Sequence, residues 1–258
     1  MKAILQVTEL NKSFGAVTAA ANINVTINEN EVVAIIGSNG AGKTTFVNMV
    51  TGYLKPTSGC IQFRGADITG LPPRDVSRSG VCRSFQVAQL FPDLTVLENM
   101  MLAFASLQIT ASSYFSPLHS VEAETRAFEV LDDFGIGSHA HAQVCIFAQG
   151  VRKLLDIAMA MVSRPPLLLL DEPTSGVAIE EKFALMDTVM EGVSRSESAV
   201  MFIEHDMEIV SKYASRVIAF YDGRIIADGP TEVALAQEQV REFIIGEIQE
   251  AAVAGVKK

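Results

Sequence analysis

Residues 31–45 read EVVAIIGSNGAGKTT, and this stretch decides the fold. Glu31–Ile36 is continuously apolar after its first residue, which is typical of a strand buried on both faces of a parallel sheet. The residues that follow fit the pattern G-x-x-x-x-G-K-S/T, and a helical pattern continues from them to Gly52. The stretch therefore predicts a strand, a phosphate-binding loop and a helix in immediate succession.

The glycine-rich loop has the chemistry of a nucleoside triphosphate site. Glycines let successive backbone N–H groups converge on an anion, and the following helix N-terminus adds positive potential. Lys43 is expected to reach the β- and γ-phosphates, and the Thr44 hydroxyl is expected to bind Mg²⁺. An ordinary glycine-rich turn is the alternative, but the strand before the loop and the helix after it favour nucleotide binding. Nucleotide contacts are expected from Gly37, Ser38, Asn39, Gly40, Ala41, Gly42, Lys43, Thr44 and Thr45.

Two carboxylates follow a second buried strand. Leu167–Leu170 delivers Asp171 and Glu172 at its carboxyl end, where α/β sheets bind ligands. Asp171 suits contact with Mg²⁺, directly or through water, and Glu172 suits polarisation of a water in line with the γ-phosphate. A single carboxylate at a strand end is more often a solvated charge or a helix cap. The pair, taken with the phosphate loop, favours a hydrolytic site.

His205 follows a third buried strand, Ala199–Ile203. A lone histidine at a strand-to-helix junction is usually a cap or a packed ring, and the sequence leaves that alternative open. Adjacent strand ends carrying Glu172 and His205 would bring both side chains to the γ-phosphate, so His205 is a candidate catalytic residue.

Composition narrows the class of protein. The chain has 258 residues, with 20 Lys and Arg against 30 Asp and Glu, a net charge of −10. This acidic balance disfavours a nucleic-acid partner. The hydrophobic fraction of 49% excludes a disordered chain. No apolar run reaches the length of a membrane-spanning helix, and the N-terminus lacks the apolar core of a signal peptide. We therefore expect a cytoplasmic protein. Its scattered cysteines are expected to be reduced thiols: Cys60, Cys82 and Cys145.

The order of predicted elements indicates one α/β domain with a helical insert. Alternation in Ile4–Leu10 and Ile23–Ile27 predicts half-exposed antiparallel strands. We expect a core over about 1–86 and 164–235, a helical insert over about 87–163 and C-terminal helices over about 231–258. We expect helices at Thr95–Leu107, Val121–Phe134, Val151–Val162, Ala178–Val193 and His205–Tyr213. We also expect a β-hairpin that joins Arg216–Tyr221 to Arg224–Asp228.

These residues together resemble the nucleotide-binding subunits of ATP-binding-cassette (ABC) transporters, over nearly the whole chain. Phe14 matches the aromatic residue that stacks on adenine, Gln86 matches the Q-loop glutamine that senses Mg²⁺ and the membrane partner, and His205 matches the switch histidine. The resemblance implies a P-loop nucleoside-triphosphatase core (RecA-like) with a mostly parallel sheet, an N-terminal antiparallel β subdomain and an inserted helical subdomain. It also implies transport-coupled ATP hydrolysis with Mg²⁺, in which Glu172, His205 and Gln86 are catalytic and Thr44, Gln86 and Asp171 contact the metal.

The resemblance also identifies a signature segment, Phe147–Val151, which stands where the family has LSGGQ. Here Ala148 replaces the serine, Gln149 replaces a glycine, Val151 replaces the glutamine, and Gly150 is retained. In the family this segment opens a helix that contacts the γ-phosphate bound by the opposite subunit, which implies that role for Ala148 and Gly150. The D-loop is altered as well, with Ala178 where Asp or Asn is usual. We expect pairing with a different subunit that carries a fuller signature; a homodimer stays open.

Residues 83–103, the tripeptide Leu155-Asp156-Ile157 and the ending Phe243–Glu247 look like importer subunits for branched-chain amino acids, or their urea and amide relatives. The resemblance implies membrane-spanning permease subunits, a second ATP-binding subunit and, indirectly, a substrate-binding protein as partners, at the cytoplasmic face of the membrane. An apolar docking patch is expected over Val87–Leu107.

Two other classes remain as alternatives. A GTPase would need N-K-x-D, and the only Asn-Lys, Asn11-Lys12, lacks the aspartate; a small-molecule kinase usually lacks a glutamate after the strand-end aspartate. The other class is an ABC-type ATP-binding module with a degenerate signature in a regulatory, non-transport or other-substrate complex. A DNA-repair role for such a module is disfavoured by the acidic balance and by the lack of a coiled-coil insert.

Overall fold

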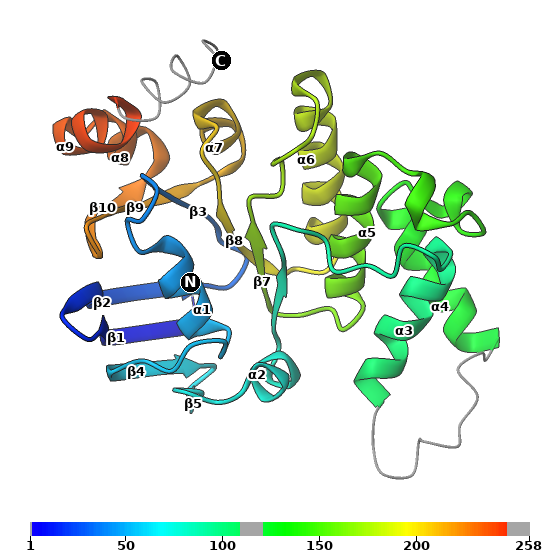
Figure 1. Ribbon diagram of the computed structural model, residues 1–258, viewed down its shortest axis with the longest axis horizontal. Helices are drawn as coiled ribbons and strands as arrows, with labels where there is room; N and C mark the ends of the chain where they lie inside the picture. Colours follow the sequence, from blue (N-terminus) through cyan, green and yellow to red (C-terminus); the bar gives the residue numbers. More distant parts are fainter. Residues whose placement is uncertain (1, 109–120, 247–258) are drawn as a thin grey trace. The chain divides into compact units, whose positions relative to one another are not determined.

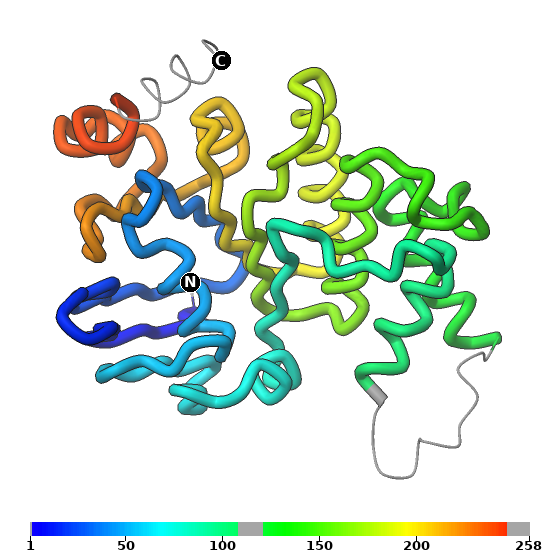
Figure 2. The backbone as a smooth tube through the Cα atoms, viewed as in Figure 1, coloured from blue at the N-terminus to red at the C-terminus, as the bar shows by residue number. Residues whose placement is uncertain are grey.

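The computed structural model describes residues 2–108 and 121–246, and the chain divides into two compact units (Figure 1). Unit 1 joins Met1–Ser79 to Ala199–Lys258, and unit 2 is the continuous segment Gly80–Ser198. In Figure 2 the backbone leaves unit 1 in its cyan part and returns to it in its yellow part. The boundaries expected for a helical insert near residues 87 and 163 stay a prediction.

Unit 1 contains an antiparallel sheet formed by the first strands of the chain (Figure 1). Val7 lies opposite Val25 on one side and opposite Ile61 on the other, and all three side chains are buried. The antiparallel strands predicted around Ile4–Leu10 and Ile23–Ile27 are thereby confirmed. The strand order is β2-β1-β4-β5, with β1 at Ala3–Phe14, β2 at Val17–Asn28, β4 at Ser58–Phe63 and β5 at Ala66–Asp67.

Unit 1 also contributes four strands to a mainly parallel sheet, in the order β10-β9-β3-β8. Strand β3 pairs in parallel with both β8 and β9, so it is hydrogen-bonded along both edges and its residues from Val33 onward are buried. The apolar run that predicted a doubly covered strand is explained by this central position. The strands are β3 at Val32–Gly37, β8 at Ala199–Ile203, β9 at Arg216–Tyr221 and β10 at Arg224–Pro230.

Six helical segments complete the described part of unit 1. They are α1 at Lys43–Val50, α2 at Pro73–Ser79, α7 at Met207–Tyr213, α8 at Thr231–Ala236, α9 at Glu238–Val240 and a single π-helical turn, η4, at Arg241–Ile245.

An ion-pair network holds the β9–β10 hairpin of unit 1 together. The Arg216 guanidinium donates to both carboxylate oxygens of Asp228, at 2.5 and 2.7 Å, and to Glu31 Oε1 at 3.1 Å. The hydrogen bonds to Asp228 raise the pKa of Arg216 above its ordinary value, so the arginine stays charged. Because Arg216 also donates to the Thr26 carbonyl at 2.9 Å, one side chain joins β9, β10 and the end of β2.

Unit 2 pairs two parallel strands and packs four longer helices. Strand β6 lies beside β7 with Ser84 opposite Leu170, and β7 is buried throughout. Helix α3, Val96–Gln108, begins with a capping box: Thr95 Oγ1 accepts from the Glu98 amide at 3.1 Å, and Glu98 Oε2 accepts from the Thr95 amide at 2.7 Å. The elements are β6 at Val81–Ser84, α3 at Val96–Gln108, α4 at Val121–Asp133, η2 at Gly137–His139, η3 at Val144–Ile146, α5 at Gln149–Met161, β7 at Leu167–Asp171 and α6 at Ile179–Ser194.

None of the helices within residues 2–108 and 121–246 combines the length and the apolar character that crossing a bilayer requires.

Candidate functional site

The phosphate loop of unit 1 connects the end of β3 to the start of α1. Lys43 is buried, and its Nζ donates to the carbonyls of Gly37 at 2.6 Å and Ser38 at 2.9 Å. Helix α1 has Gly42 at its N-cap, with no side-chain cap and no acid in the first turn. Its first N–H groups are therefore not engaged by a side-chain cap, and the helix end favours an anion.

Two glycines make the close packing of this loop possible. Gly42 has φ 102°, and a Cβ there would lie 2.6 Å from the Ala19 carbonyl oxygen and 3.2 Å from the Gly223 Cα. A Cβ at Gly37 would lie 2.4 Å from the Phe220 carbonyl oxygen. The loop thus packs against the β2 and β9 backbones at distances that leave no room for a side chain.

His205 and the start of the phosphate loop lie at the same edge of the unit 1 sheet. Ile35 on β3 is level with Ile203 on the parallel strand β8, so Gly37 and His205 each follow two residues further on. Asp206 caps the next helix, accepting a hydrogen bond from the Glu208 amide at 3.1 Å. His205 is therefore held between a buried strand and a capped helix.

Phe14 ends β1 of unit 1 with an exposed ring. Lys12 Nζ lies 4.9 Å from the centre of that ring, a cation–π contact, and also donates to the Lys55 carbonyl at 2.8 Å. An exposed aromatic face of this kind suits stacking on a base, the role that the family resemblance implies for it.

Gln86 and Glu172 come together in unit 2. The β6–β7 register sets Ser84 opposite Leu170, and Gln86 and Glu172 each lie two residues beyond this pair. Gln86 Nε2 donates to Glu172 Oε2 at 2.6 Å. Glu172 has φ 47°, a left-handed conformation that is costly for a residue with a side chain and that clusters at functional sites.

Asp171 has a cationic partner that the sequence did not indicate. Arg83 Nη2 forms an ion pair with Asp171 Oδ2, and the two side chains are only 7% and 9% exposed. The Arg83 guanidinium also lies 5.0 Å from the centre of the Phe85 ring. A charge buried this deeply is tolerated when it is paired, so Arg83 offsets the desolvation of Asp171.

The signature segment forms the N-terminus of α5, two residues earlier than the predicted Val151 start. Ala148 is the N-cap and has no side-chain cap hydrogen bond, and Gln149 is the first helical residue. A Cβ at Gly150 would lie 3.7 Å from Glu181 Oε2, an ordinary contact. Replacing the family's serine with Ala148 therefore removes a helix cap as well as a hydroxyl donor.

Two buried charged residues of α5, Lys153 and Asp156, were also missed at the level of sequence. Both hydrogen-bond to the backbone of residues 85–89, the segment around Gln86 that we call the Q-loop. The signal that could have found them is their place among the apolar residues Leu155, Ile157 and Ala158, where surface charges are not expected. Arg83 carried no comparable signal, because the short strand Val81–Ser84 was not predicted.

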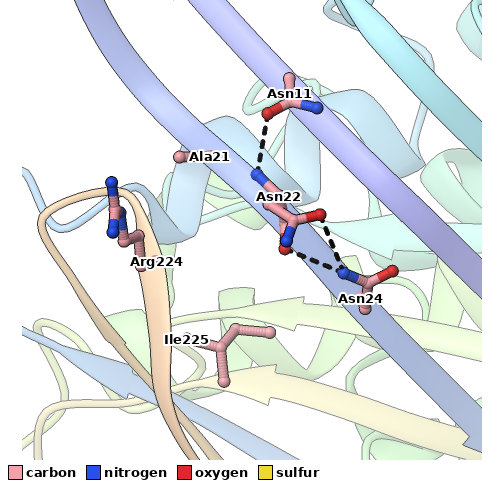
Figure 3. A pocket seen from close by; sticks show the side chains of 6 residues that line it. All are labelled: Asn11, Ala21, Asn22, Asn24, Arg224 and Ile225. Carbon is pink, nitrogen blue, oxygen red and sulfur yellow. Dashed lines mark hydrogen bonds between the residues drawn. The ribbon is translucent and has the colours of Figure 1, made fainter.

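One hollow in unit 1 is lined by none of these residues (Figure 3). It is lined by Asn11, Ala21, Asn22, Asn24, Arg224 and Ile225. Its side-chain amides bond to backbone groups of the β1–β2 hairpin, whose register is irregular. Asn11 Oδ1 accepts from the Asn22 amide at 2.8 Å, and Asn24 Nδ2 donates to the Asn22 carbonyl at 3.0 Å. These bonds give the asparagines a structural role in the hairpin.

Comparison with known proteins identifies the family. The family described as ABC transporter matches residues 20–175 of the 258-residue chain. The chain belongs to the ABC transporter family. The high-affinity branched-chain amino acid transport ATP-binding protein LivG of Escherichia coli strain K12 is 36% identical over 253 residues, covering 95% of this chain and 98% of LivG. The corresponding BraF of Pseudomonas aeruginosa is 33% identical over 250 residues, with 95% and 98% covered.

A solved structure of an ABC cassette agrees with the fold. The ADP conformation of MJ1267, an ATP-binding cassette of an ABC transporter, has a TM-score of 0.85 at 28% identity, covering 96% of this chain and 99% of that one. This agreement confirms the expected fold class. Family membership confirms that this chain is an ABC-type ATPase that binds nucleotide.

Proposed function

We propose that this ABC ATPase drives an importer of branched-chain amino acids or related small amides across the cytoplasmic membrane. The cargo class is supported by the names of LivG and BraF, which match nearly all of the chain. The observation that carries the catalytic assignment is the 2.6 Å hydrogen bond between Gln86 and Glu172. It brings the Q-loop amide to the carboxylate that directly follows Asp171.

In this proposal the phosphate loop binds ATP and Glu172 is the general base. The residues from Gly37 to Thr45 surround the phosphates with backbone N–H groups, and Lys43 balances their charge. Phe14 stacks on adenine, while His205 and Gln86 contact the γ-phosphate region. Glu172 polarises the attacking water, and Ala148 and Gly150 contact the nucleotide of the opposite subunit through the α5 N-terminus.

The oxygen donors present suit Mg²⁺. Thr44 offers a hydroxyl, Gln86 an amide oxygen and Asp171 a carboxylate, which are the hard ligands that this ion prefers. Arg83 pairs with Oδ2 of Asp171, and the Asp171 carboxylate would hold the ion directly or through water. Mg²⁺ would neutralise charge on the β- and γ-phosphates, and Asp171 would orient it.

We propose that an apolar loop of unit 2 docks onto a membrane-spanning permease subunit at the cytoplasmic face. Val87 and Phe91 are exposed there. Buried Asn99 fixes the Phe91 backbone, accepting from its amide at 2.9 Å and donating to its carbonyl at 3.1 Å. An exposed ring on a fixed backbone is preorganised for a protein partner, because little entropy is lost on binding.

We further propose that the chain pairs with a second ATP-binding subunit, and that a substrate-binding protein acts with the complex indirectly. The altered signature segment and Ala178 favour a different chain with a fuller signature as that subunit.

The test of the catalytic assignment is Glu172→Gln in the full chain. Loss of the base should lower phosphate release by about 10²- to 10⁴-fold, while affinity for a fluorescent ATP analogue stays within about threefold. Glu129→Gln, on the exposed face of α4, is the matched control and should retain full activity. Turnover by Glu172→Gln at the wild-type rate would contradict the role of Glu172.

The test of docking is Phe91→Asp, with Val233→Asp in α8 as an equally exposed control. We expect Phe91→Asp to lose most co-purification with the permease subunits while ATP affinity is unchanged, because a charge cannot be buried in an apolar contact. Unchanged co-purification would count against this surface.

A further inference from the structure

Helix α5 carries two charged side chains on its buried face. Lys153 is 3% exposed and Asp156 is 7% exposed, and their spacing of three residues puts them on the same side of the helix. Burying two charges is costly unless each finds hydrogen-bond partners, so the identity of those partners is informative.

Both side chains hydrogen-bond to the backbone of the Q-loop, and Lys153 also bonds to the backbone of Glu172. Asp156 Oδ2 accepts from the Phe85 amide at 3.1 Å, and Asp156 Oδ1 accepts from the Gln89 amide at 3.0 Å. Lys153 Nζ donates to the Phe85 carbonyl at 3.1 Å, to the Gln86 carbonyl, and to the Glu172 carbonyl at 3.3 Å. One ammonium group therefore holds the main chain of both residues whose side chains form the Gln86–Glu172 hydrogen bond.

We propose that Lys153 and Asp156 are positioning residues that set the Gln86–Glu172 pair and connect it to the signature segment. This inference rests on the proposed catalytic roles of Gln86 and Glu172. Helix α5 begins at Gln149, so Lys153 lies about one turn after the first residue of α5 and two residues after the signature segment ends, on the same helix. A displacement of the α5 N-terminus carries the Lys153 ammonium with it, and this moves the backbones of Gln86 and Glu172.

A merely structural role makes a different prediction. If Lys153 only filled a buried polar gap, its loss would lower stability and leave the turnover of the folded enzyme unchanged. A positioning role lowers kcat at saturating ATP while KM for ATP is little changed, because the phosphate loop of unit 1 is not altered. A cation of similar reach should then restore turnover.

The first experiment measures hydrogen–deuterium exchange of the full chain carrying Asp156→Asn. The asparagine keeps one acceptor oxygen where aspartate has two, so one of the two amides loses its acceptor. We expect exchange at Phe85 or Gln89 to accelerate at least about tenfold, with amides of the buried strand β7 unchanged. Wild-type exchange at both amides would overturn the proposal.

The second experiment compares Lys153→Met and Lys153→Arg with Lys2→Met, which removes an exposed ammonium paired with Glu29. We expect Lys153→Met to lose about tenfold to a hundredfold in kcat with KM within about threefold, Lys153→Arg to recover most of the loss, and Lys2→Met to match wild type. Unchanged kcat in folded Lys153→Met, or failure of Lys153→Arg to rescue, would overturn the positioning role. If Lys153→Met does not fold, the exchange result for Asp156→Asn decides.

The two proposals fail differently. Wild-type turnover by Glu172→Gln would overturn the catalytic assignment on which the inference rests. Unchanged kcat in Lys153→Met beside an inactive Glu172→Gln would overturn the positioning role alone.

Discussion

Replacing Arg83 by methionine should destabilise unit 2 by about 4 kcal/mol. The ion pair with Asp171 joins side chains that are 7% and 9% exposed, and removing one partner of a buried pair costs about 3–5 kcal/mol because the other charge stays buried. Loss of the cation–π contact with Phe85, at 5.0 Å, adds about 0.5–2 kcal/mol, which the apolar packing of methionine partly offsets. The expected loss therefore lies near the middle of that range.

Urea unfolding monitored by circular dichroism measures this loss. With an m-value of about 2 kcal/mol/M, the midpoint assigned to unit 2 should fall by about 2 M. The matched control is Arg195→Met, which breaks an ion pair to Asp133 in the same unit whose side chains are 59% and 39% exposed. An exposed pair is worth less than about 1 kcal/mol, so its midpoint should move by less than about 0.5 M.

A double variant separates the ion pair from other effects of the methionine. Arg83→Met combined with Asp171→Leu removes both charges and should recover much of the lost stability, since a buried pair replaced by apolar residues is often neutral. The reasoning is refuted if Arg83→Met shifts the midpoint no more than Arg195→Met does.

Three further predictions concern the loop, the signature segment and α5. Ala148→Ser should stabilise unit 2 by about 1 kcal/mol in urea unfolding, because the hydroxyl caps α5; no change would show the helix end to be capped otherwise. Gly42→Ala should weaken ATP binding at least about tenfold, because the added Cβ would lie 2.6 Å from a carbonyl oxygen. Gly229→Ala is the control: a Cβ there has no atom within 4 Å, so this variant should bind ATP with wild-type affinity. Burial raises the pKa of Asp156 above its usual 3.8, so the folded state binds that proton more tightly than the unfolded state. In urea unfolding, the free energy of unfolding of the wild type minus that of Asp156→Asn should therefore decrease as pH rises from about 3.8 through the raised pKa. An increase of this difference with pH would contradict the prediction.

The strands with strong local patterns were predictable, and the weak ones were not. The run Val32–Ile36 appears as the central strand β3, because a strand paired on both edges and covered on both faces must be apolar throughout. Strand β6 was missed because Val81–Ser84 is short and includes a charged Arg83, whose burial depends on a partner elsewhere in the chain. Helix α5 was placed two residues late, because Ala148 provides no capping side chain to mark its start.

The candidate site likewise contains residues that the local sequence predicts and residues that depend on distant partners. Local motifs predict the phosphate loop, Asp171 and Glu172, because the chemistry at each position is set by neighbouring residues in the chain. Gln86 follows only from the family resemblance. The sequence gives no site role to Arg83, Lys153 or Asp156, because each bonds to a partner at least 67 positions away in the chain.

The sequence by itself determined the glycine-rich loop and the buried strands around it, since glycine spacing and apolar runs constrain the backbone locally. Only the tertiary structure decided that Gln86 bonds Glu172, that Arg83 neutralises Asp171 and that α5 holds the Q-loop through Lys153 and Asp156. The physical reason is that a buried charge must be paired, and which partner it finds depends on the fold bringing distant segments into register rather than on the residues beside it.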